Sequence, residues 1–356
     1  MSAAVLRAPF PYFGGKRRAA SLVWEALGNV DHYVEPFAGS AAVLLARPHV
    51  GRCETINDRD GMVANFWRAV RAAPAEVAHH ADWPVSEADL HARHRWLIGQ
   101  RESLTERLIE DPEWYDARIA GWWCWGACAW IGDGWCVAEV RKLPHLGDAG
   151  RGINSPSRKL PHLGGAGRGI NSLSRQLPHL GDEGMGVRAP RRGRAVGTDH
   201  VDVESVEGWM HALAARLRAV RVACGDWRRV VASPSVLFPA GRSNPGYICG
   251  VYLDPPYAEG AADYAVGGTG SSLSAEVRAW CEEHDRDPRV RIVLSGYEGE
   301  HDALQRRGWR VVEWRAAGGY SNAGGNNVNR HRERLWLSPH CVGARQPGLF
   351  DARRAQ

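Results

Sequence analysis

The fold is decided by the stretch Tyr33-Val34-Glu35-Pro36-Phe37-Ala38-Gly39-Ser40, which predicts a short strand, a glycine turn and the start of a helix. Ser40 is placed to cap that helix, which we expect to run through Leu45. Gly39 lets the backbone approach a ligand closely at such a turn. Nucleotide-like ligands sit at the carboxyl ends of strands in α/β sheets. The stretch therefore predicts a ligand loop, although many folds contain one such turn.

The next strand, Cys53 to Ile56, ends in Asn57-Asp58. An acidic side chain here can accept hydrogen bonds from both hydroxyls of a ribose. Asp58 follows Gly39 by 58 − 39 = 19 residues, close to the ~20 typical of ribose-binding carboxylates in such units. Alone, Asp58 is as well explained as a solvated turn residue. Together with the glycine turn, it favours a bound ligand.

Strands and helices alternate in the rest of the chain that flanks this unit. A helix from Glu207 to Arg218 precedes VRVACGDW, and the strand Tyr247 to Leu253 follows. A helix near Ser274 to Glu283 leads to the strand VRIVLSGY, and WRVVEWRAA and RERLWLS form a closing pair of strands. This alternation predicts an α/β fold with a largely parallel sheet.

The middle of the chain has a different pattern. Apolar residues recur at three and four positions from Ala88 to Ile109, and a second helix is expected from Glu113 towards Trp130, after Asp111-Pro112 as a start signal. The Trp-rich run Trp122 to Trp125 is interpreted as helix packing rather than a base-stacking surface. The four arginines of the first helix are either solvated or phosphate-facing: Arg93, Arg95, Arg101 and Arg107.

A tandem repeat begins at Arg141 and returns after 158 − 141 = 17 residues and again after 175 − 158 = 17 residues. Each unit is rich in Gly, Pro and Ser and has few apolar residues, so it cannot bury a core and is expected to be loop or disorder. The repeated His145, His162 and His179 are explained by duplication rather than by metal binding.

The strongest chemical signal is Asp254-Pro255-Pro256-Tyr257, directly after a strand. The lone pair of an exocyclic amine on a purine is delocalised into the ring. Two acceptors can hold its N–H bonds in the nucleophilic geometry: the Asp254 carboxylate and the Pro255 carbonyl. The proline pair stiffens this backbone, and Tyr257 offers a ring face for an extruded base. The alternative is a plain Pro-Pro turn after a strand.

Five segments now resemble one known family in order. They are PYFGGK (Pro11 to Lys16), VEPFAGSAAV (Val34 to Val43), INDRDGMVANFWRAV (Ile56 to Val70), CGDW (Cys224 to Trp227) and DPPY (Asp254 to Tyr257). In these segments the sequence resembles the DNA adenine methylase family (Dam-like, D12 class) of N6-adenine DNA methyltransferases. The resemblance implies methyl transfer from S-adenosyl-L-methionine to a flipped-out adenine in double-stranded DNA.

The resemblance also implies roles by position. Lys16 would lie near the carboxylate end of the cofactor, Asp58 would bind its ribose, and Asp226 its adenine amine. Asp254 would face both methyl donor and target base. The full cofactor set is Tyr12, Phe13, Gly14, Gly15, Lys16, Glu35, Pro36, Phe37, Ala38, Gly39, Ser40, Asn57, Asp58, Asp226, Trp227 and Asp254, and the catalytic set is Asp254, Pro255, Pro256 and Tyr257.

The resemblance implies a Rossmann-like methyltransferase sheet with helices on both faces and an inserted, mainly helical target-recognition region. We expect a discontinuous catalytic domain in residues 1–70 and 206–340, and the target-recognition region in 71–140. The repeats and a linker occupy 141–205, and a tail occupies 341–356. In that tail, Gln346 to Phe350 resembles the Gln-x-x-Leu-Phe peptide that binds the replication sliding clamp; a plain tail is the simpler interpretation.

The composition is compatible with these expectations without deciding between them. A formal net charge of +5 suits a polyanionic partner but also an ordinary soluble protein. Neither a membrane span nor a signal peptide is visible, so we expect a cytoplasmic protein with free thiols, a monomer that binds no membrane. Cys124, Cys128 and Cys136 lack a paired CxxC spacing, so we expect no metal.

Three related activities and one loss of activity remain as alternatives. N4-cytosine methylation uses the same amine chemistry, usually with Ser in place of Asp254. C5-cytosine methylation needs a Pro-Cys pair, and no Cys here follows a Pro. An RNA adenine methyltransferase fits the chemistry, although the motif order favours DNA. A catalytically inactive DNA-binding relative is disfavoured by the intact DPPY and glycine loop.

Overall fold

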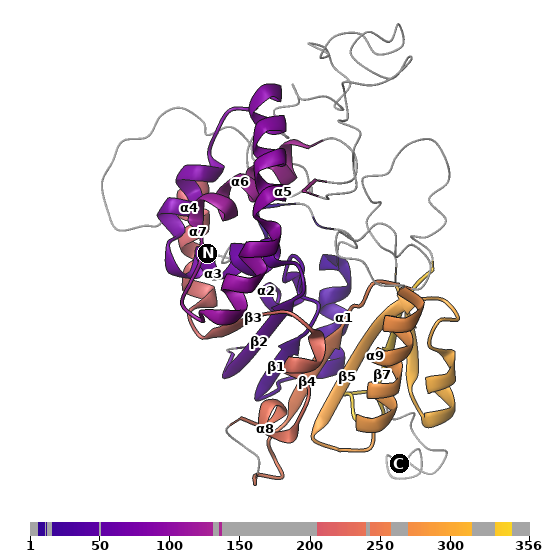
Figure 1. Ribbon diagram of the computed structural model, residues 1–356. Coiled ribbons are helices and arrows are strands. Elements are labelled where there is room, and N and C mark those ends of the chain that lie inside the picture. Colours follow the sequence, from indigo (N-terminus) through magenta and orange to yellow (C-terminus); the bar gives the residue numbers. More distant parts are fainter. Residues whose placement is uncertain are drawn as a thin grey trace, which may run out of the picture. The chain divides into compact units, whose positions relative to one another are not determined.

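Seven strands pair into one sheet in the part of the chain that the computed structural model describes (Figure 1). The model describes residues 6–10, 12, 16–49, 51–130, 135–136, 205–239, 243–257, 270–314 and 332–343. The sheet order is β3-β2-β1-β4-β5-β7-β6. The strands are β1 (His32–Glu35), β2 (Cys53–Asp58), β3 (Val220–Cys224), β4 (Cys249–Leu253), β5 (Val290–Tyr297), β6 (Arg310–Glu313) and β7 (Glu333–Leu337).

The sheet is parallel from β3 to β5, whereas β7 pairs in antiparallel register with both β5 and β6. This confirms the predicted α/β fold with a largely parallel sheet, and the two strands expected to close it pair in antiparallel register. Two strand bounds differ from those expected. β2 continues through Asp58, because Asn57 and Asp58 stay in register with β3, and β4 begins at Cys249 rather than Tyr247.

Helices cover both faces of this sheet. Val251 packs in a core with Val277 and Cys281 of α9 (Gly270–His284), and Figure 1 shows α9 along β5 and β7. The neighbouring Gly250 faces Leu27 at the end of α1 (Arg17–Leu27). Successive residues of a strand point to opposite faces, so α1 and α9 lie on opposite sides. The remaining helices of this part are α2 (Ala42–Leu45), α8 (Pro234–Leu237) and the 3-10 helices η2 (Trp227–Val230) and η4 (Asp302–Arg307).

The chain divides into two compact units. A sheet unit comprises Gly14–Asp58 and Ala219–Gln356, and a helical unit comprises Met1–Phe13 and Arg59–Arg218. The division falls elsewhere than the expected catalytic bounds of 1–70 and 206–340, because two helices assigned to the catalytic domain pack with the helical unit. The helices of that unit are α3 (Gly61–Ala72), α4 (Pro74–Ala81), α5 (Glu87–Glu110), α6 (Ala117–Ala129) and α7 (Val206–Leu217).

The expected start of α6 is wrong. Asp111 accepts hydrogen bonds from the backbone amides of Glu113 and Trp114 and so forms a turn. The helix begins after Asp116, whose carboxylate accepts from Ile119 N at 2.7 Å. Both Asp111-Pro112 and Asp116 are residues that favour the start of a helix, and it is Asp116 that caps α6.

Some of the aromatic and basic side chains of the helical unit pack inside it. Trp123 and Trp125 are buried, as the packing interpretation predicted. The Arg93 guanidinium lies 4.2 Å from the centroid of the Trp125 ring, and Arg101 donates to Asp60 at 3.0 Å. Of the four arginines of α5, Arg95 and Arg107 are exposed, and the Arg107 guanidinium lies 5.5 Å from the centroid of the Trp114 ring. The open choice between a solvated and a phosphate-facing role therefore concerns Arg95 and Arg107 above all.

Several expectations lie outside the described residues: the 17-residue repeats with their histidines, Phe13 to Gly15, and Gln346 to Phe350. Within the described part, none of the helices is both long and apolar enough to cross a membrane.

Candidate functional site

The predicted site residues of the sheet unit lie at one edge of the sheet. Parallel strands present their carboxyl ends at the same edge, so the residues after β1, β2, β3 and β4 gather there. β1 pairs with β2 on one side and with β4 on the other. The chain thus reverses its direction of travel across the sheet between β1 and β4, which is where such sheets bind ligands.

The glycine loop after β1 is held by two carboxylates. Gly39 has a φ of 47°, in the left-handed region that glycine tolerates best, and its amide donates to Asp58 Oδ2 at 2.9 Å. Ser40 does not cap α2, contrary to expectation: the N-cap residue is Ala41. Buried Glu35 accepts from Leu44 N at 3.2 Å instead, and so satisfies a donor in the first turn of α2.

Glu35 is itself an unusual acid. Burial raises its pKa to about 8, although hydrogen bonds from Tyr33 and from the Leu44 amide favour the charged form. The Tyr33 hydroxyl donates to Glu35 Oε2 at 3.0 Å. Glu35 thus serves as a structural anchor of the loop, beside the buried Pro36 and Ala38.

The end of β2 supplies an amide and a carboxylate. Asn57 is buried, and its Nδ2 donates to the carbonyls of Pro36 and Gly225, each at 3.0 Å. It therefore ties the loops after β1 and β3 together. Its Oδ1 is buried and has no hydrogen-bond partner among the described residues. Asp58 is half-buried, and one of its oxygens serves the Gly39 amide.

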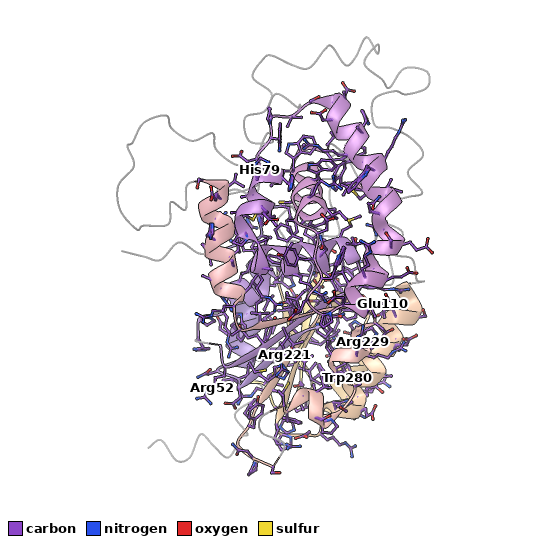
Figure 2. The ribbon with its side chains drawn as sticks, turned by 60° about the vertical axis from the view of Figure 1, so that its left-hand side comes forward. Arg52, His79, Glu110, Arg221, Arg229 and Trp280 are labelled. Carbon is purple, nitrogen blue, oxygen red and sulfur yellow. The ribbon has the colours of Figure 1, made fainter. Side chains whose placement is uncertain are left out.

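The end of β3 contributes a solvent-facing carboxylate and a buried ring. The Asp226 side chain is 52% exposed and accepts from Arg228 N at 2.9 Å, which leaves it open towards solvent. Trp227 is buried, with its ring 5.8 Å from that of Phe37 and 6.3 Å from that of Trp280 on α9. Figure 2 labels Trp280 and Arg229, which mark α9 and η2 beside this wall of the site.

The DPPY turn after β4 belongs to a buried cluster of charged groups. Lys16 Nζ lies 3.2 Å from Asp254 Oδ1 and 3.2 Å from Glu333 Oε2. The Tyr257 hydroxyl lies 2.8 Å from Glu333 Oε2 and 3.2 Å from Asp254 Oδ1, and Lys16 also donates to that hydroxyl. Only Asp254 retains appreciable exposure, 19% of its side chain against 7% for Lys16 and Glu333.

The protonation of this cluster follows from burial and pairing. Burial raises the pKa of Asp254 and of Glu333, against the attraction of Lys16. Burial alone would lower the pKa of Lys16, but the two carboxylates outweigh it and its pKa lies above the ordinary value. Lys16 therefore stays charged at neutral pH, and both acids bind protons more tightly than exposed ones.

Tyr257 is placed differently from the simplest sequence interpretation. Its side chain is buried, and its ring packs edge-on against Tyr297 at 4.5 Å, with Lys16 Nζ 4.7 Å from its centroid. The hydroxyl is hydrogen-bonded to Glu333, Asp254 and Lys16, so it is held in place as well as the ring. Pro255 is buried and Pro256 half-buried beside it.

Glu333 is the site residue that sequence reasoning missed. It is the first residue of β7, opposite Tyr297 at the end of β5. Because β7 is antiparallel to β5, its first residue lies at the edge where the parallel strands end. The signal was available in RERLWLS, where charged residues precede the apolar run Leu335 to Leu337. Among the predicted cofactor residues, Tyr12 belongs to the helical unit.

The comparisons with known proteins agree with this geometry. No curated protein matches the chain. Residues 12–93 match the family model of the D12 class N6 adenine-specific DNA methyltransferases. The matched segment contains Lys16, the glycine loop and Asp58, three of the elements that meet at the sheet edge. Over this segment, which is about a quarter of the chain, the protein is similar to the D12 class N6 adenine-specific DNA methyltransferases.

Proposed function

We propose that the chain transfers a methyl group from S-adenosyl-L-methionine to the N6 amine of an adenine that is flipped out of double-stranded DNA at a specific sequence. The observation that carries this proposal is the position of Asp254. Its carboxylate follows β4 at the switch point beside β1 and stays partly exposed, while its partners Lys16 and Glu333 are buried. It is thus an anchored acceptor that still faces outward.

The residues at the sheet edge fit the cofactor. Carboxylates at the ends of β2 and β3, Asp58 and Asp226, suit the hydroxyls of a ribose and the amine of an adenine. The buried Asn57 Oδ1 has no hydrogen-bond donor among the described residues, so a bound ligand could supply one. At the turn with left-handed φ, Gly39 has no side chain that would keep a ligand away from the backbone. When bound, S-adenosylmethionine supplies the electrophilic methyl group.

The chain's own residues act on the target amine. The Asp254 carboxylate and the Pro255 carbonyl accept hydrogen bonds from the two N–H groups of this amine. They thereby favour its nucleophilic geometry as positive charge develops on N6. Lys16 and Tyr257 fix the orientation of Asp254 through their contacts with Oδ1. The buried surroundings strengthen these interactions.

Base flipping and target recognition complete the proposal. Within a duplex, N6 is paired and stacked, and extrusion costs a few kcal/mol. Tyr257 and the neighbouring Tyr297 are the aromatic residues that the structure gathers beside Asp254. We assign target recognition to residues 71–140, as expected from their place between the two groups of motifs.

The test is transfer of a tritiated methyl group from labelled cofactor to unmethylated DNA, followed by identification of the modified nucleoside. Asp254→Ala is expected to lower transfer by about a hundredfold to a thousandfold, the cost of losing one preorganised hydrogen-bonding group that stabilises a transition state, with an unchanged circular dichroism spectrum. N4-methylcytosine as the product, methylation of RNA alone, or Asp254→Ala activity within about tenfold of wild type would overturn the assignment.

A further inference from the structure

The cluster behind Asp254 contains one more carboxylate than it has cations. Asp254 and Glu333 share the single ammonium of Lys16, which lies 3.2 Å from an oxygen of each. Among the described residues, no other cation forms an ion pair with either of them. The next residue along β7, Arg334, pairs with Glu298 at 3.1 Å and Glu313 at 3.5 Å instead.

The groups packed around the cluster do not supply the missing positive charge. Tyr257 and Tyr297 are neutral phenols, and burial raises the pKa of Tyr297 further. Glu35, at the end of β1, adds like charge towards Asp254 when it ionises. Arg332, just before β7, lies over the Tyr297 ring at 5.1 Å. Trp314 contributes its ring, 5.4 Å from Lys16 Nζ, and Glu300 adds negative charge near Tyr297.

We propose that Glu333 sets the charge of the site. Because Glu333 shares the ammonium of Lys16, part of the negative charge of Asp254 is left uncompensated. The site therefore binds the cationic sulfonium of the methyl donor more tightly than the neutral thioether that remains after transfer. This inference rests on the proposed function, which places the methyl donor before Asp254. Glu333 is buried and acts through Lys16 and Asp254, so it is a positioning residue.

The proposal has a direct consequence for turnover. Attraction between the cluster and the sulfur disappears when the methyl group leaves with the positive charge, so the product is held less tightly than the substrate. Burial is the main reason that the pKa values of Asp254 and Glu333 are raised, and the neighbouring Asp254 raises the pKa of Glu333 further.

The experiment measures the affinity of the full-length protein for S-adenosylmethionine and for S-adenosylhomocysteine by calorimetry. Glu333→Gln keeps the size of the side chain and an acceptor for Tyr257 and Lys16, and lets Lys16 pair fully with Asp254. We expect about tenfold weaker binding of the sulfonium compound and less than about threefold change for the thioether. Glu313→Gln, which removes an exposed carboxylate on β6, is the matched control and is expected to change neither affinity.

A second measurement needs no variant. In the wild-type protein, affinity for the sulfonium compound is expected to rise with pH as Asp254 and Glu333, whose pKa values are raised, give up their protons. This rise should be steeper than that of the affinity for the thioether. Both ligands carry the same amino-acid group, so its titration cancels in the comparison. The role of Glu333 would be overturned if the affinities for the two ligands depended equally on pH, or if Glu333→Gln weakened both equally. Either result would leave the proposed function standing. Failure of the wild-type protein to bind either ligand would overturn the proposed function and this inference with it.

Discussion

Lys16→Met isolates the contribution of the shared ammonium. Methionine keeps an unbranched apolar stem of similar length, while the two carboxylates 3.2 Å from Lys16 Nζ lose their cation. Lys16 is 6% exposed, so water cannot take over its role. The change therefore leaves two buried carboxylates that face each other with only the Tyr257 hydroxyl between them.

Breaking a buried ion pair by removing one partner costs about 3–5 kcal/mol, because the remaining charge is left uncompensated. For a domain of about 150–250 residues, each kcal/mol lowers the melting temperature by about 2–4 °C. A loss of about 3 kcal/mol thus predicts a melting temperature roughly 6–12 °C below wild type at pH 8. Thermal unfolding followed by circular dichroism measures this shift.

The loss should depend on pH with a definite sign. The folded-state pKa values of Asp254 and Glu333 already lie above their ordinary values, and removal of the ammonium raises them further. A carboxyl with a raised folded pKa contributes stability that is fully present below its unfolded pKa and is lost as pH rises through the folded pKa. Lys16→Met should therefore approach wild type near pH 4 and diverge from it towards pH 8.

The double variant Lys16→Met with Glu333→Gln is the matched control. It removes one of the two facing charges and is expected to regain much of the stability at pH 8. A Lys16→Met protein as stable as wild type at pH 8 would refute the reasoning, as would a deficit that is the same at every pH.

Three further predictions concern other parts of the chain. Asp58→Ala should weaken cofactor binding by about 1.5–3 kcal/mol, because it removes a carboxylate that also holds the Gly39 amide; unchanged affinity by calorimetry would remove Asp58 from the site. Tyr257→Phe should lower the free energy of unfolding by about 0.5–1.5 kcal/mol, through loss of its bond to Glu333, yet retain more methyl transfer than Tyr257→Ala; equal activity of the two variants contradicts a role for the ring. Deletion of residues 158–174 should be tolerated, since loop length adds little entropy; failure to yield folded protein would show that the repeat is structural.

The sequence predicted those site residues that have a local signal. Gly39, Asp58 and Asp254 each directly follow or close a strand of apolar residues, and parallel strands necessarily bring such positions to one edge. The alternation of strands and helices was enough to predict the α/β fold. These features depend on neighbouring residues in the chain, which a single sequence displays.

The remaining features depend on contacts between distant residues. Glu333 lies 333 − 254 = 79 residues after Asp254, and only the antiparallel pairing of β7 with β5 brings it to the site. Glu35 replaces Ser40 at the start of α2 because the loop inserts Ala41 in a left-handed conformation. Asp116, not Asp111, begins α6, since two capping residues compete within six positions.

The order of pairing in the sheet also bears on how the chain is made. β1 and β2 leave the ribosome early, but Val34 of β1 pairs with Val251 of β4, 251 − 34 = 217 residues later. At a synthesis rate of about 5–20 residues per second, β1 waits roughly 10–40 s for this neighbour. Every residue of the helical unit, which ends at Arg218, has emerged by then. During translation, the helices can therefore assemble first, while the first two strands keep an unpaired edge until the strand that carries Asp254 arrives.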